Sequence, residues 1–409
     1  MTARFSVART AGRFASGLSR LTGRGSGTTI GGRVTLLLDP SALSLAAAGR
    51  SFALVSGTNG KSTTRTLLAA ALSTVEPVVS NGGGANLPTG LTAALCADRL
   101  SRLGVLEVDE PFLPVVADAV MPRAVVLLNL SRDQLDRYAE VKRLAGIWRT
   151  AVASAPFTIV ANADDPLVAW AASAAPESSV IWVAAGQRWT QDSSACPQCG
   201  EALHRNGSWR CGGCGFARPE PAWRVVDGST LVDPSGVSHV PNLSLPGEVN
   251  VGNAALAAAA ASVWGVDASD AFAAMSSIDS VEGRYLRTTY AGRPLRLLLA
   301  KNPAGWGEAL RMADPSLPVV VAVNARAADG RDPSWLWDVP FEMLRGRACV
   351  ATGERARDVA VRLLYAGVEH VRIDAEAAAL RGVGGGHGPF EVLANYTAFQ
   401  TLRKVVGDG

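Results

Sequence analysis

The sequence predicts an α/β protein with a mostly parallel sheet in its central part and a second, smaller α/β unit behind it. Three observations predict this class. The chain has 409 residues, a length that fits two or three domains. Its residues are 48% hydrophobic and 18% charged, which is typical of globular proteins. From residue 51 onward, short β-like runs alternate with Ala/Leu-rich helical stretches, and this alternation indicates βαβ units.

The β-like runs fall into two groups, separated by a Gly/Arg-rich stretch over residues 281–294. We therefore predict a basic helical segment over residues 1–45 packed on the central domain, a central domain over 46–290 and a C-terminal α/β domain over 291–409. Residues 191–221 interrupt the central domain with Cys, Gly and Pro, and they are predicted to be an insertion. The runs are Phe52–Val55, Val78–Ser80, Val105–Val108, Ala124–Leu128, Thr158–Ala161, Val180–Val183, Leu295–Ala300, Val319–Val323, Ala348–Ala351 and His370–Ile373.

Composition and charge give no support to several function classes. The net charge of +3 is too small to indicate nucleic-acid binding. The longest uncharged apolar stretch, over residues 254–264, is shorter than the ~18–20 residues that a membrane-spanning helix needs. No apolar signal-peptide core follows Met1, so we expect a cytoplasmic protein.

The first 38 residues contain six arginines and no acidic residue. Ala11, Phe14, Ala15, Leu18 and Leu21 recur near helical spacing, which predicts a basic helix with an apolar stripe. Two interpretations stay open. The helix packs on the body of the protein, or it contacts an anionic surface such as the inner face of the membrane or a polyphosphate substrate.

A glycine-rich turn between a strand and a helix has the pattern of a phosphate-binding loop. Main-chain N–H groups converge at such a helix start, and the helix dipole adds positive potential there. We expect Lys61 to contact the β- and γ-phosphates of a nucleotide and the hydroxyl of Ser62 or Thr63 to hold Mg²⁺. The loop is a shortened variant, because Val55 stands where the usual form has a glycine. Its residues are Gly57, Thr58, Asn59, Gly60, Lys61, Ser62 and Thr63.

Glu107 directly follows an apolar run and would end a parallel strand, where such sheets bind ligands. Carboxylate oxygens suit Mg²⁺. We expect Glu107 to hold Mg²⁺ together with Ser62, the alternative being a solvated acid at a strand end. Asp109 and Glu110 are expected to be surface or loop-positioning groups. Asp164 and Asp165 are expected either to serve the site or to cap the helix that Pro166 begins.

Six further motifs follow the phosphate loop in order, and together they resemble the Mur ligase superfamily, which includes the peptidoglycan amino-acid ligases and folylpolyglutamate synthase. The resemblance implies ATP and Mg²⁺ as cofactors, and it places Asn253 and Arg284 in the ATP site with Lys61 and Glu107. Gln134 stands where many members have His. The motifs are Asn81–Asn86, the strand end at Glu107, Asn129-Leu130 with Asp133–Arg137, Asn162–Pro166, Pro246–Asn253 and Gly283-Arg284.

Four cysteines form two C-x₂-C knuckles, each followed by glycine. A compact hairpin brings four such thiolates together, and four sulfur ligands close a tetrahedral site without an open position for water. We therefore expect a structural Zn²⁺, the alternative being a redox pair or disulfides. His204 is a possible substitute ligand but is not needed. The knuckles are Cys196 with Cys199 and Cys211 with Cys214.

The knuckles and several other segments resemble one branch of the superfamily, the MurT-type synthase subunits of lipid II isoglutaminyl synthase. The resemblance implies an ATP-dependent carbon–nitrogen ligase that amidates the α-carboxylate of D-glutamate in the lipid II stem peptide through an acyl phosphate, giving D-isoglutamine. The other segments are Ser19–Gly25, Arg132–Tyr138, Lys301–Gly305, Ala328–Asp332 and Asn395–Thr397.

The same resemblance implies a heterodimer with a class I glutaminase-like subunit that supplies ammonia. An acidic residue of the C-terminal domain would complete the Cys-His pair of that subunit, and Asp332 is the first candidate and Asp338 the second. Lys301 has no assigned role. Two alternatives remain: a ligase that adds an amino acid to a peptide or folate carboxylate, and a non-catalytic scaffold with the cysteine hairpin as a docking tip.

Overall fold

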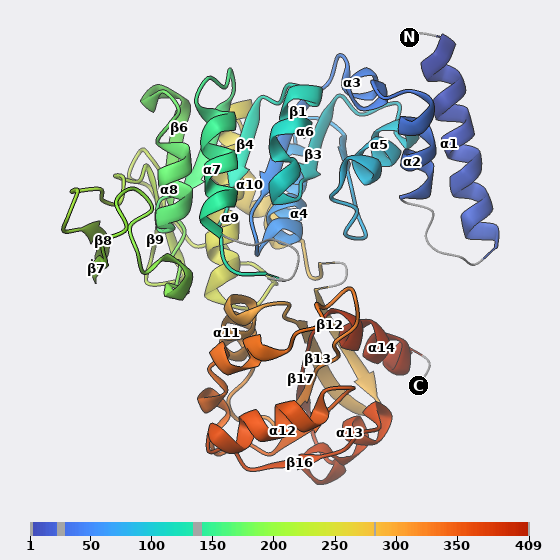
Figure 1. Cartoon of the computed structure of the whole chain (residues 1–409), viewed down its shortest axis with the longest axis vertical. Coiled ribbons are helices and arrows are strands. Elements are labelled where there is room, and N and C mark those ends of the chain that lie inside the picture. Colours follow the sequence, from blue (N-terminus) through green and yellow to red (C-terminus); the bar gives the residue numbers. More distant parts are fainter. Residues whose placement is uncertain (1–2, 23–28, 134–140, 282–283, 408–409) are drawn as a thin grey trace. The chain divides into compact units, whose positions relative to one another are not determined.

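The computed structural model describes residues 3–22, 29–133, 141–281 and 284–407 and divides into two compact units (Figure 1). The first unit comprises the described residues up to 130 together with 141–279. The second comprises 131–133 and the described residues from 280 onward. The domain boundaries that the sequence suggested at residues 45 and 290 stay predictions.

The first unit is built on a nine-stranded sheet in the order β11-β10-β9-β6-β5-β4-β1-β3-β2. Neighbouring strands from β2 to β9 run parallel, and only β10 and β11 add antiparallel pairs at one edge. Val55 lies opposite Glu107 on β3 and Val126 on β4, so the carboxyl ends of these strands are level. The strands are β1 Ser51–Ser56, β2 Val78–Ser80, β3 Leu103–Glu107, β4 Ala124–Leu127, β5 Thr158–Asn162, β6 Val180–Ala184, β9 Trp223–Val226, β10 Thr230–Val232 and β11 Ser238–His239.

Helices cover both faces of this sheet. On one face α4 (Lys61–Leu72) packs with α9 (Glu248–Ala261) and α10 (Ala268–Ser276). The α9 residues Ala254–Ala261 are almost all alanine and buried, and such small side chains let the helix lie close to the strands. The other face carries a hydrophobic core in which Trp148 is fully buried. Its helices, seen side by side in Figure 1, are α6 (Leu113–Val120), α7 (Val141–Val152) and α8 (Pro166–Ala172), with α5 (Pro88–Ala97) beyond them.

In the described part of the chain, three helices precede the sheet: α1 (Ala3–Leu21), α2 (Ile30–Leu38) and α3 (Ala42–Ala47). At the crossing of α1 and α2 a Cβ added to Gly12 would lie 2.5 Å from the carbonyl oxygen of Gly31, so only glycine fits there. The buried residues of α1 are Phe5, Ala8 and Gly12. The apolar stripe that the sequence predicts on this helix is therefore not its packing face, and Phe14, Leu18 and Leu21 are exposed.

The insertion between β6 and β9 contains a small antiparallel hairpin, β7 (Leu203–Asn206) and β8 (Ser208–Cys211). Short loops on either side of it carry the cysteine knuckles. The hairpin forms a sheet of its own, separate from the nine-stranded sheet.

The second unit has a six-stranded sheet in the order β12-β13-β17-β14-β15-β16, parallel except for the β12–β13 pair. Helices α13 (Glu376–Gly382) and α14 (Tyr396–Gly407) share a core on one face. The other two helices are α11 (Pro303–Met312) and α12 (Ala356–Tyr365). The strands are β12 Tyr285–Tyr290, β13 Arg293–Leu299, β14 Val319–Ala322, β15 Cys349–Thr352, β16 His370–Arg372 and β17 Phe390–Ala394.

The predicted architecture is confirmed: a mostly parallel central sheet with a cysteine-bearing insertion, followed along the chain by a smaller α/β unit. Among the residues that the structure describes, no helix combines the length and the apolar character needed to cross a bilayer.

The contact between α2 and α5 gives a testable prediction. A Cβ on Gly32 would lie 1.7 Å from the carbonyl oxygen of Thr89, so Gly32→Ala forces the two helices apart. We expect Gly32→Ala to lower the free energy of unfolding by about 1–3 kcal/mol, as overpacked cores do. Urea unfolding measures the change. Gly17→Ala is the matched control, since nothing lies within 4 Å of its Cβ, and it should be neutral or slightly stabilising. Equal stabilities of the two variants would contradict the packing described.

Candidate nucleotide and metal sites

The loop between β1 and α4 is held against the end of β4 by one asparagine. The Asn59 N–H donates to Oδ1 of Asn129 (2.9 Å), and the side-chain amide of Asn129 donates back to the carbonyl of Asn59 (3.0 Å). The Thr58 N–H donates to the main-chain carbonyl of Asn129 (2.9 Å). The sequence placed Asn129 in a motif without a role. Its position directly after a predicted strand is the sequence signal that could have indicated this role in holding the loop.

Two glycines give the loop its shape. Gly60 has a φ of +84°, and a Cβ on it would lie 2.6 Å from Oδ1 of Asn253. A Cβ on Gly57 would lie 2.7 Å from Cβ of Leu128. Asn253, predicted for the nucleotide site, therefore comes from α9 to touch the loop, and its side-chain amide is oriented by a hydrogen bond to Asn250 (3.1 Å).

Glu107 is 3% exposed at the end of β3, which excludes the alternative of a solvated strand-end acid. The Ser62 hydroxyl donates to its Oε2 (2.7 Å). The side chain of Asn81 holds the main chain of Glu107: its Oδ1 accepts from the Glu107 N–H (2.8 Å), and its amide donates to the Glu107 carbonyl (2.9 Å). A buried carboxylate beside a hydroxyl is the hard-oxygen donor set that Mg²⁺ prefers, so the predicted pair of ligands fits this ion.

Lys61 points to Glu110, for which the sequence predicts a place at the surface or a role in positioning the loop. Glu110 is only 7% exposed, and its Oε2 lies 3.1 Å from Nζ of Lys61. The expectation of a surface group is wrong, because Glu110 opens a short 3₁₀ turn that directs its side chain inward. Trp148 secures that turn by donating its indole N–H to the Glu110 carbonyl (3.0 Å). Burial raises the pKa of Glu110 to about 7, against the opposing effect of Lys61.

The acidic pair before α8 serves the local structure. Asp165 caps the helix, since its Oδ1 accepts from the N–H groups of Leu167 (2.8 Å) and Val168 (3.2 Å). Its Oδ2 accepts from the N–H of Leu130 (2.8 Å), the residue after Asn129. Of the two roles that the sequence left open for Asp165, capping is the one observed, with an added contact behind the phosphate loop.

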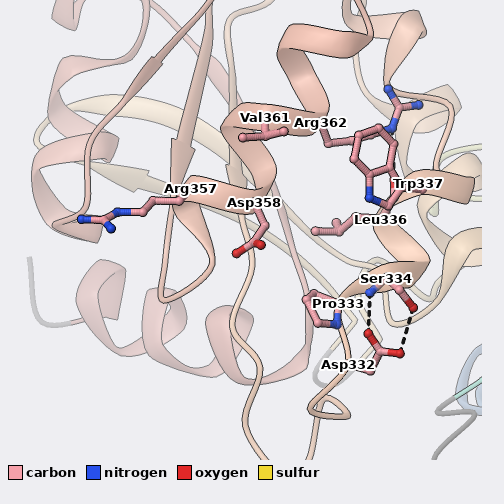
Figure 2. Close-up of a pocket in the computed structure, with 9 residues that line it drawn as sticks. All are labelled: Asp332, Pro333, Ser334, Leu336, Trp337, Arg357, Asp358, Val361 and Arg362. Atoms are coloured by element: carbon pink, nitrogen blue, oxygen red, sulfur yellow. Dashed lines mark hydrogen bonds between the residues drawn. The ribbon is translucent and has the colours of Figure 1, made fainter.

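In the second unit, Asp332 lies at the edge of a cleft of about 360 Å³ (Figure 2). Its carboxylate accepts from the N–H and the hydroxyl of Ser334, both at 2.9 Å. These hydrogen bonds hold the pKa of Asp332 below its usual value, so the group is ionised at neutral pH. Trp337 and, on α12, Asp358 also line the cleft. Asp332 is exposed and therefore available to a partner molecule.

The other candidates in this unit are more constrained. Asp338 forms an ion pair with Arg132 (3.2 Å). The Lys301 ammonium lies 5.3 Å from the centre of the Tyr396 ring. Arg284 precedes β12, with its N–H bonded to the carbonyl of Val281 (3.0 Å), and its predicted role at ATP stays a prediction. The predictions for Gln134, for the rest of the motif through Arg137 and for Gly283 concern residues outside the described part of the chain.

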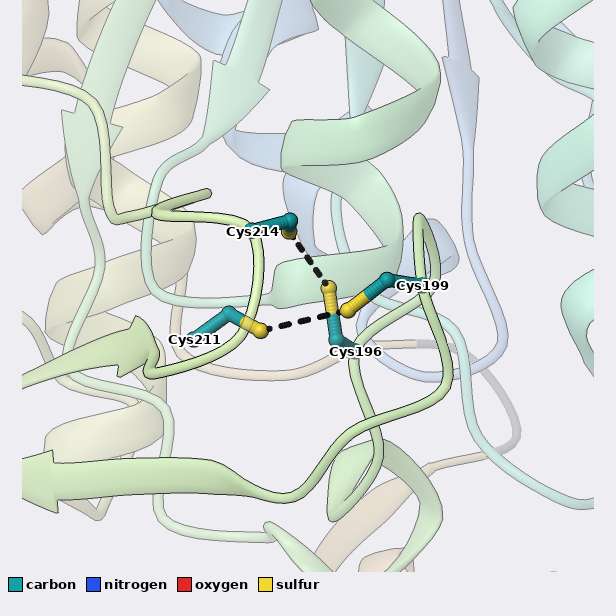
Figure 3. Close-up of side chains that lie close together, drawn as sticks. All are labelled: Cys196, Cys199, Cys211 and Cys214. Carbon is teal, nitrogen blue, oxygen red and sulfur yellow. Dashed lines mark hydrogen bonds between the residues drawn. The ribbon is translucent and has the colours of Figure 1, made fainter.

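The four cysteines of the knuckles come together at the base of the β7–β8 hairpin (Figure 3). Their Sγ atoms all lie within 4.8 Å of one another. Cys196 and Cys214 are 3.7 Å apart, and Cys199 and Cys211 are 3.4 Å apart. Tetrahedral zinc with sulfur ligands at about 2.3 Å puts the sulfurs about 3.8 Å apart, so the cluster fits a Zn²⁺ ion. A hydrogen bond from the Cys214 N–H, helped by the Cys199 thiol, lowers the pKa of Cys211 to about 7, whereas the pKa of Cys199 is raised to about 12, since the bond from the Glu201 N–H is outweighed by burial and by hydrogen bonds with the other thiols. Of these two groups, Cys211 is the one that favours the thiolate.

The hairpin is anchored on the loop that precedes α8. Trp209 donates its indole N–H to the carbonyl of Ala163 (2.9 Å). Arg218 forms an ion pair with Asp164 (2.6 Å), which also accepts from the N–H of Gly186 (2.7 Å). Asp164 is thus used to attach the insertion to the sheet. His204 is exposed beside Gly212, as expected for a residue outside the ligand set.

The sequence and the fold match known proteins. Residues 55–261 match the Mur ligase middle domain family, and residues 299–399 match the MurT ligase C-terminal family. The solved structure of a pseudomurein peptide ligase type C from Methanothermus fervidus superposes with a TM-score of 0.68 at 19% identity, covering 88% of this chain and 79% of that one. This fold and the family matches place the chain in the class of Mur-type ATP-dependent ligases.

Two curated relatives narrow the class. The MurT subunit of lipid II isoglutaminyl synthase from Streptococcus pneumoniae (strain ATCC BAA-255 / R6) is 30% identical over 381 residues, 86% of this chain and 84% of that protein. The MurT subunit from Staphylococcus aureus (strain N315) is 29% identical over 375 residues, with 86% and 85% covered. The chain belongs to the MurT family of Mur ligases.

The buried acid beside Lys61 predicts a pH dependence of stability. Between about pH 4.5 and 7 the folded chain keeps a proton on Glu110 that the unfolded chain has lost, since the pKa of Glu110 is raised to about 7. The free energy of unfolding should therefore fall as the pH rises through this window, by up to about 1.4 kcal/mol per pH unit. Glu110→Gln removes this component, and urea unfolding at several pH values measures it. The exposed Glu220→Gln is the control and should follow the wild-type profile; parallel profiles for wild type and Glu110→Gln would contradict the assignment.

The cysteine cluster predicts a metal content of one zinc per chain. Cys199→Ser removes one thiolate, about a quarter of a site energy on the order of 12 kcal/mol, so we expect zinc affinity to fall about 100-fold. Elemental analysis and competition with a chromogenic chelator measure this. His204→Gln should keep its zinc, because His204 is outside the ligand set. Zinc content unchanged in Cys199→Ser would argue against a four-cysteine site.

Proposed function

We propose that this chain is the synthase subunit that amidates the α-carboxylate of D-glutamate in the lipid II stem peptide, giving D-isoglutamine at the expense of ATP. One observation carries the proposal: a chain that aligns with MurT subunits over 86% of its length keeps Lys61, Ser62 and Glu107 together at the end of its parallel sheet. This reaction belongs to the synthesis of peptidoglycan.

In the first step a carboxylate oxygen of the substrate attacks the γ-phosphorus of ATP, the bond from that phosphorus to the bridging oxygen breaks, and ADP leaves behind an acyl phosphate. The main-chain N–H groups of the loop and the Lys61 ammonium would stabilise the negative charge on the moving phosphoryl group. Mg²⁺, which Ser62 and Glu107 would hold, neutralises phosphate charge when bound. Because Lys61 is paired with Glu110 in the free protein, the incoming phosphate competes with that carboxylate for the ammonium.

In the second step the nitrogen of ammonia attacks the acyl carbon, the carbon–oxygen bond to phosphate breaks, and the nitrogen loses a proton to give the amide. The chain needs an outside source of ammonia, which is mostly NH₄⁺ at neutral pH. Cys96 and Cys349 are buried, and burial raises the pKa of both thiols, that of Cys349 to about 11. Neither is suited to be the nucleophile of a glutaminase. A partner glutaminase chain supplies the ammonia in this proposal.

We propose Asp332 as the first candidate, and Asp338 as the second, for the acidic residue that completes the active site of the partner glutaminase. Asp332 is exposed, ionised and set at the edge of a cleft, which suits a carboxylate that orients a histidine of another chain. Asp338 is already engaged by Arg132.

The reaction is tested by phosphate release and by mass spectrometry of the product, with lipid II, ATP and either NH₄Cl or glutamine plus the co-expressed glutaminase. We expect both nitrogen sources to give product one mass unit lighter than the substrate. Stimulation by free amino acids in place of ammonia would replace this proposal with an amino-acid ligase, and no turnover with any nitrogen source would leave the scaffold alternative.

Asp332→Asn tests the assignment to the partner site. Removing the carboxylate should lower glutamine-dependent amidation at least about 100-fold, in line with the loss of an orienting acid, and leave NH₄Cl-dependent amidation unchanged. The control is Asp314→Asn, because Asp314 forms the same turn, accepting from the N–H (2.9 Å) and hydroxyl (2.6 Å) of Ser316, but does not line the cleft. Equal loss of both activities in Asp332→Asn would place this residue elsewhere in the mechanism.

A further inference from the structure

Helix α1 presents a row of large apolar side chains to solvent. Val7 is 66% exposed, Phe14 74%, Leu18 52% and Leu21 87%. They stand at positions i, i+7, i+11 and i+14 of a 19-residue helix, so they lie along one face. We call these four residues the outer stripe. Single exposed apolar residues are ordinary, but a row of four on one helix is a mark of an interaction surface.

The outer stripe does not contribute to holding α1 on the protein. The opposite face does that through Phe5, Ala8 and Gly12, all of which are buried. Gly12 allows α1 to cross α2 at close range, and Arg4 ties the start of α1 to the end of α2 by donating to the carbonyl of Leu38 (2.8 Å). The helix is therefore rigidly mounted with its apolar stripe directed outward.

The charge around the outer stripe indicates what would cover it. Arg9, Arg13 and Arg20 form a second row on α1, and Arg13 and Arg20 are exposed. Residues 1–38 hold six arginines and no acidic side chain, whereas the whole chain is nearly balanced at +3. An apolar stripe on one face of a helix and a basic row on another face is the pattern of helices that lie in the interface of a membrane carrying anionic lipids.

We propose that α1 binds the surface of an anionic membrane, with the outer stripe in the acyl boundary and the arginine row at the headgroup phosphates. The helix lies on the bilayer and does not cross it. This inference rests on the helix alone and not on the proposed reaction. It also gives the central unit a route to substrates that are themselves anchored in lipid.

Co-sedimentation of the full chain with vesicles of phosphatidylglycerol and phosphatidylcholine in equal parts tests the proposal, without ATP or lipid II. We expect the chain to pellet with these vesicles and Phe14→Asp/Leu18→Asp to bind about tenfold more weakly, since two apolar side chains can no longer be buried. Arg13→Gln/Arg20→Gln should weaken binding to a similar extent, and salt should weaken that of the wild type. Because all four side chains are exposed, thermal unfolding should be unchanged in both variants.

The matched control is Leu100→Asp/Leu364→Asp, which makes the same chemical change at two exposed leucines away from α1. It should bind vesicles like the wild type. The proposal is overturned if the wild type stays in the supernatant, if the control and the α1 variant bind equally, or if pure phosphatidylcholine vesicles bind the chain as well. Loss of glutaminase co-purification in Phe14→Asp/Leu18→Asp with vesicle binding intact would also overturn it and would make the stripe a protein interface.

Discussion

The proposed nucleotide site depends on one constraint, that three parallel strands end at the same level. The register of the strands places Val55 of β1 opposite Glu107 of β3 and Val126 of β4. The phosphate loop therefore follows β1 at the level where β3 supplies a carboxylate and β4 leads to Asn129. A slip of one residue between β1 and β3 would turn Glu107 to the other face of the sheet and separate it from Ser62. The buried aliphatic side chains of these strands therefore set the chemistry, since they fix the register.

A second constraint is the cost of burying charge beside the loop. Lys61, Glu107 and Glu110 are all nearly inaccessible to water, and each is compensated by a partner from another element. Such pairs seldom add net stability, because desolvation offsets their attraction. The proposed function explains their presence. Under that proposal, Lys61 and the acids hold each other in place until a nucleotide and its metal ion bind.

How much could be predicted from the sequence depended on how local each feature is. The phosphate loop and the cysteine knuckles are short patterns, and the structure brings the residues of each together. Glu110 was misjudged because nothing local shows that a 3₁₀ turn folds its side chain under Lys61. The stripe on α1 was found from its periodicity, but which face packs is decided by Gly12 and its fit to α2, a contact between separate helices. Strand β17 lies in the middle of its sheet and is missing from the predicted strands, since its short run FEVLA is interrupted by the acidic residue Glu391.

The attachment of the cysteine hairpin has a consequence for the distant phosphate loop. The hairpin contacts Ala163 and Asp164. The next residue, Asp165, accepts a hydrogen bond from Leu130, and Asn129, which precedes Leu130, is hydrogen-bonded to the phosphate loop. Every link in this row is a hydrogen bond or an ion pair between adjacent segments of one unit. Chelators or oxidants that unfold the hairpin would remove the outermost of these contacts. ATP binding at the proposed phosphate loop would then depend on the redox state of the surroundings.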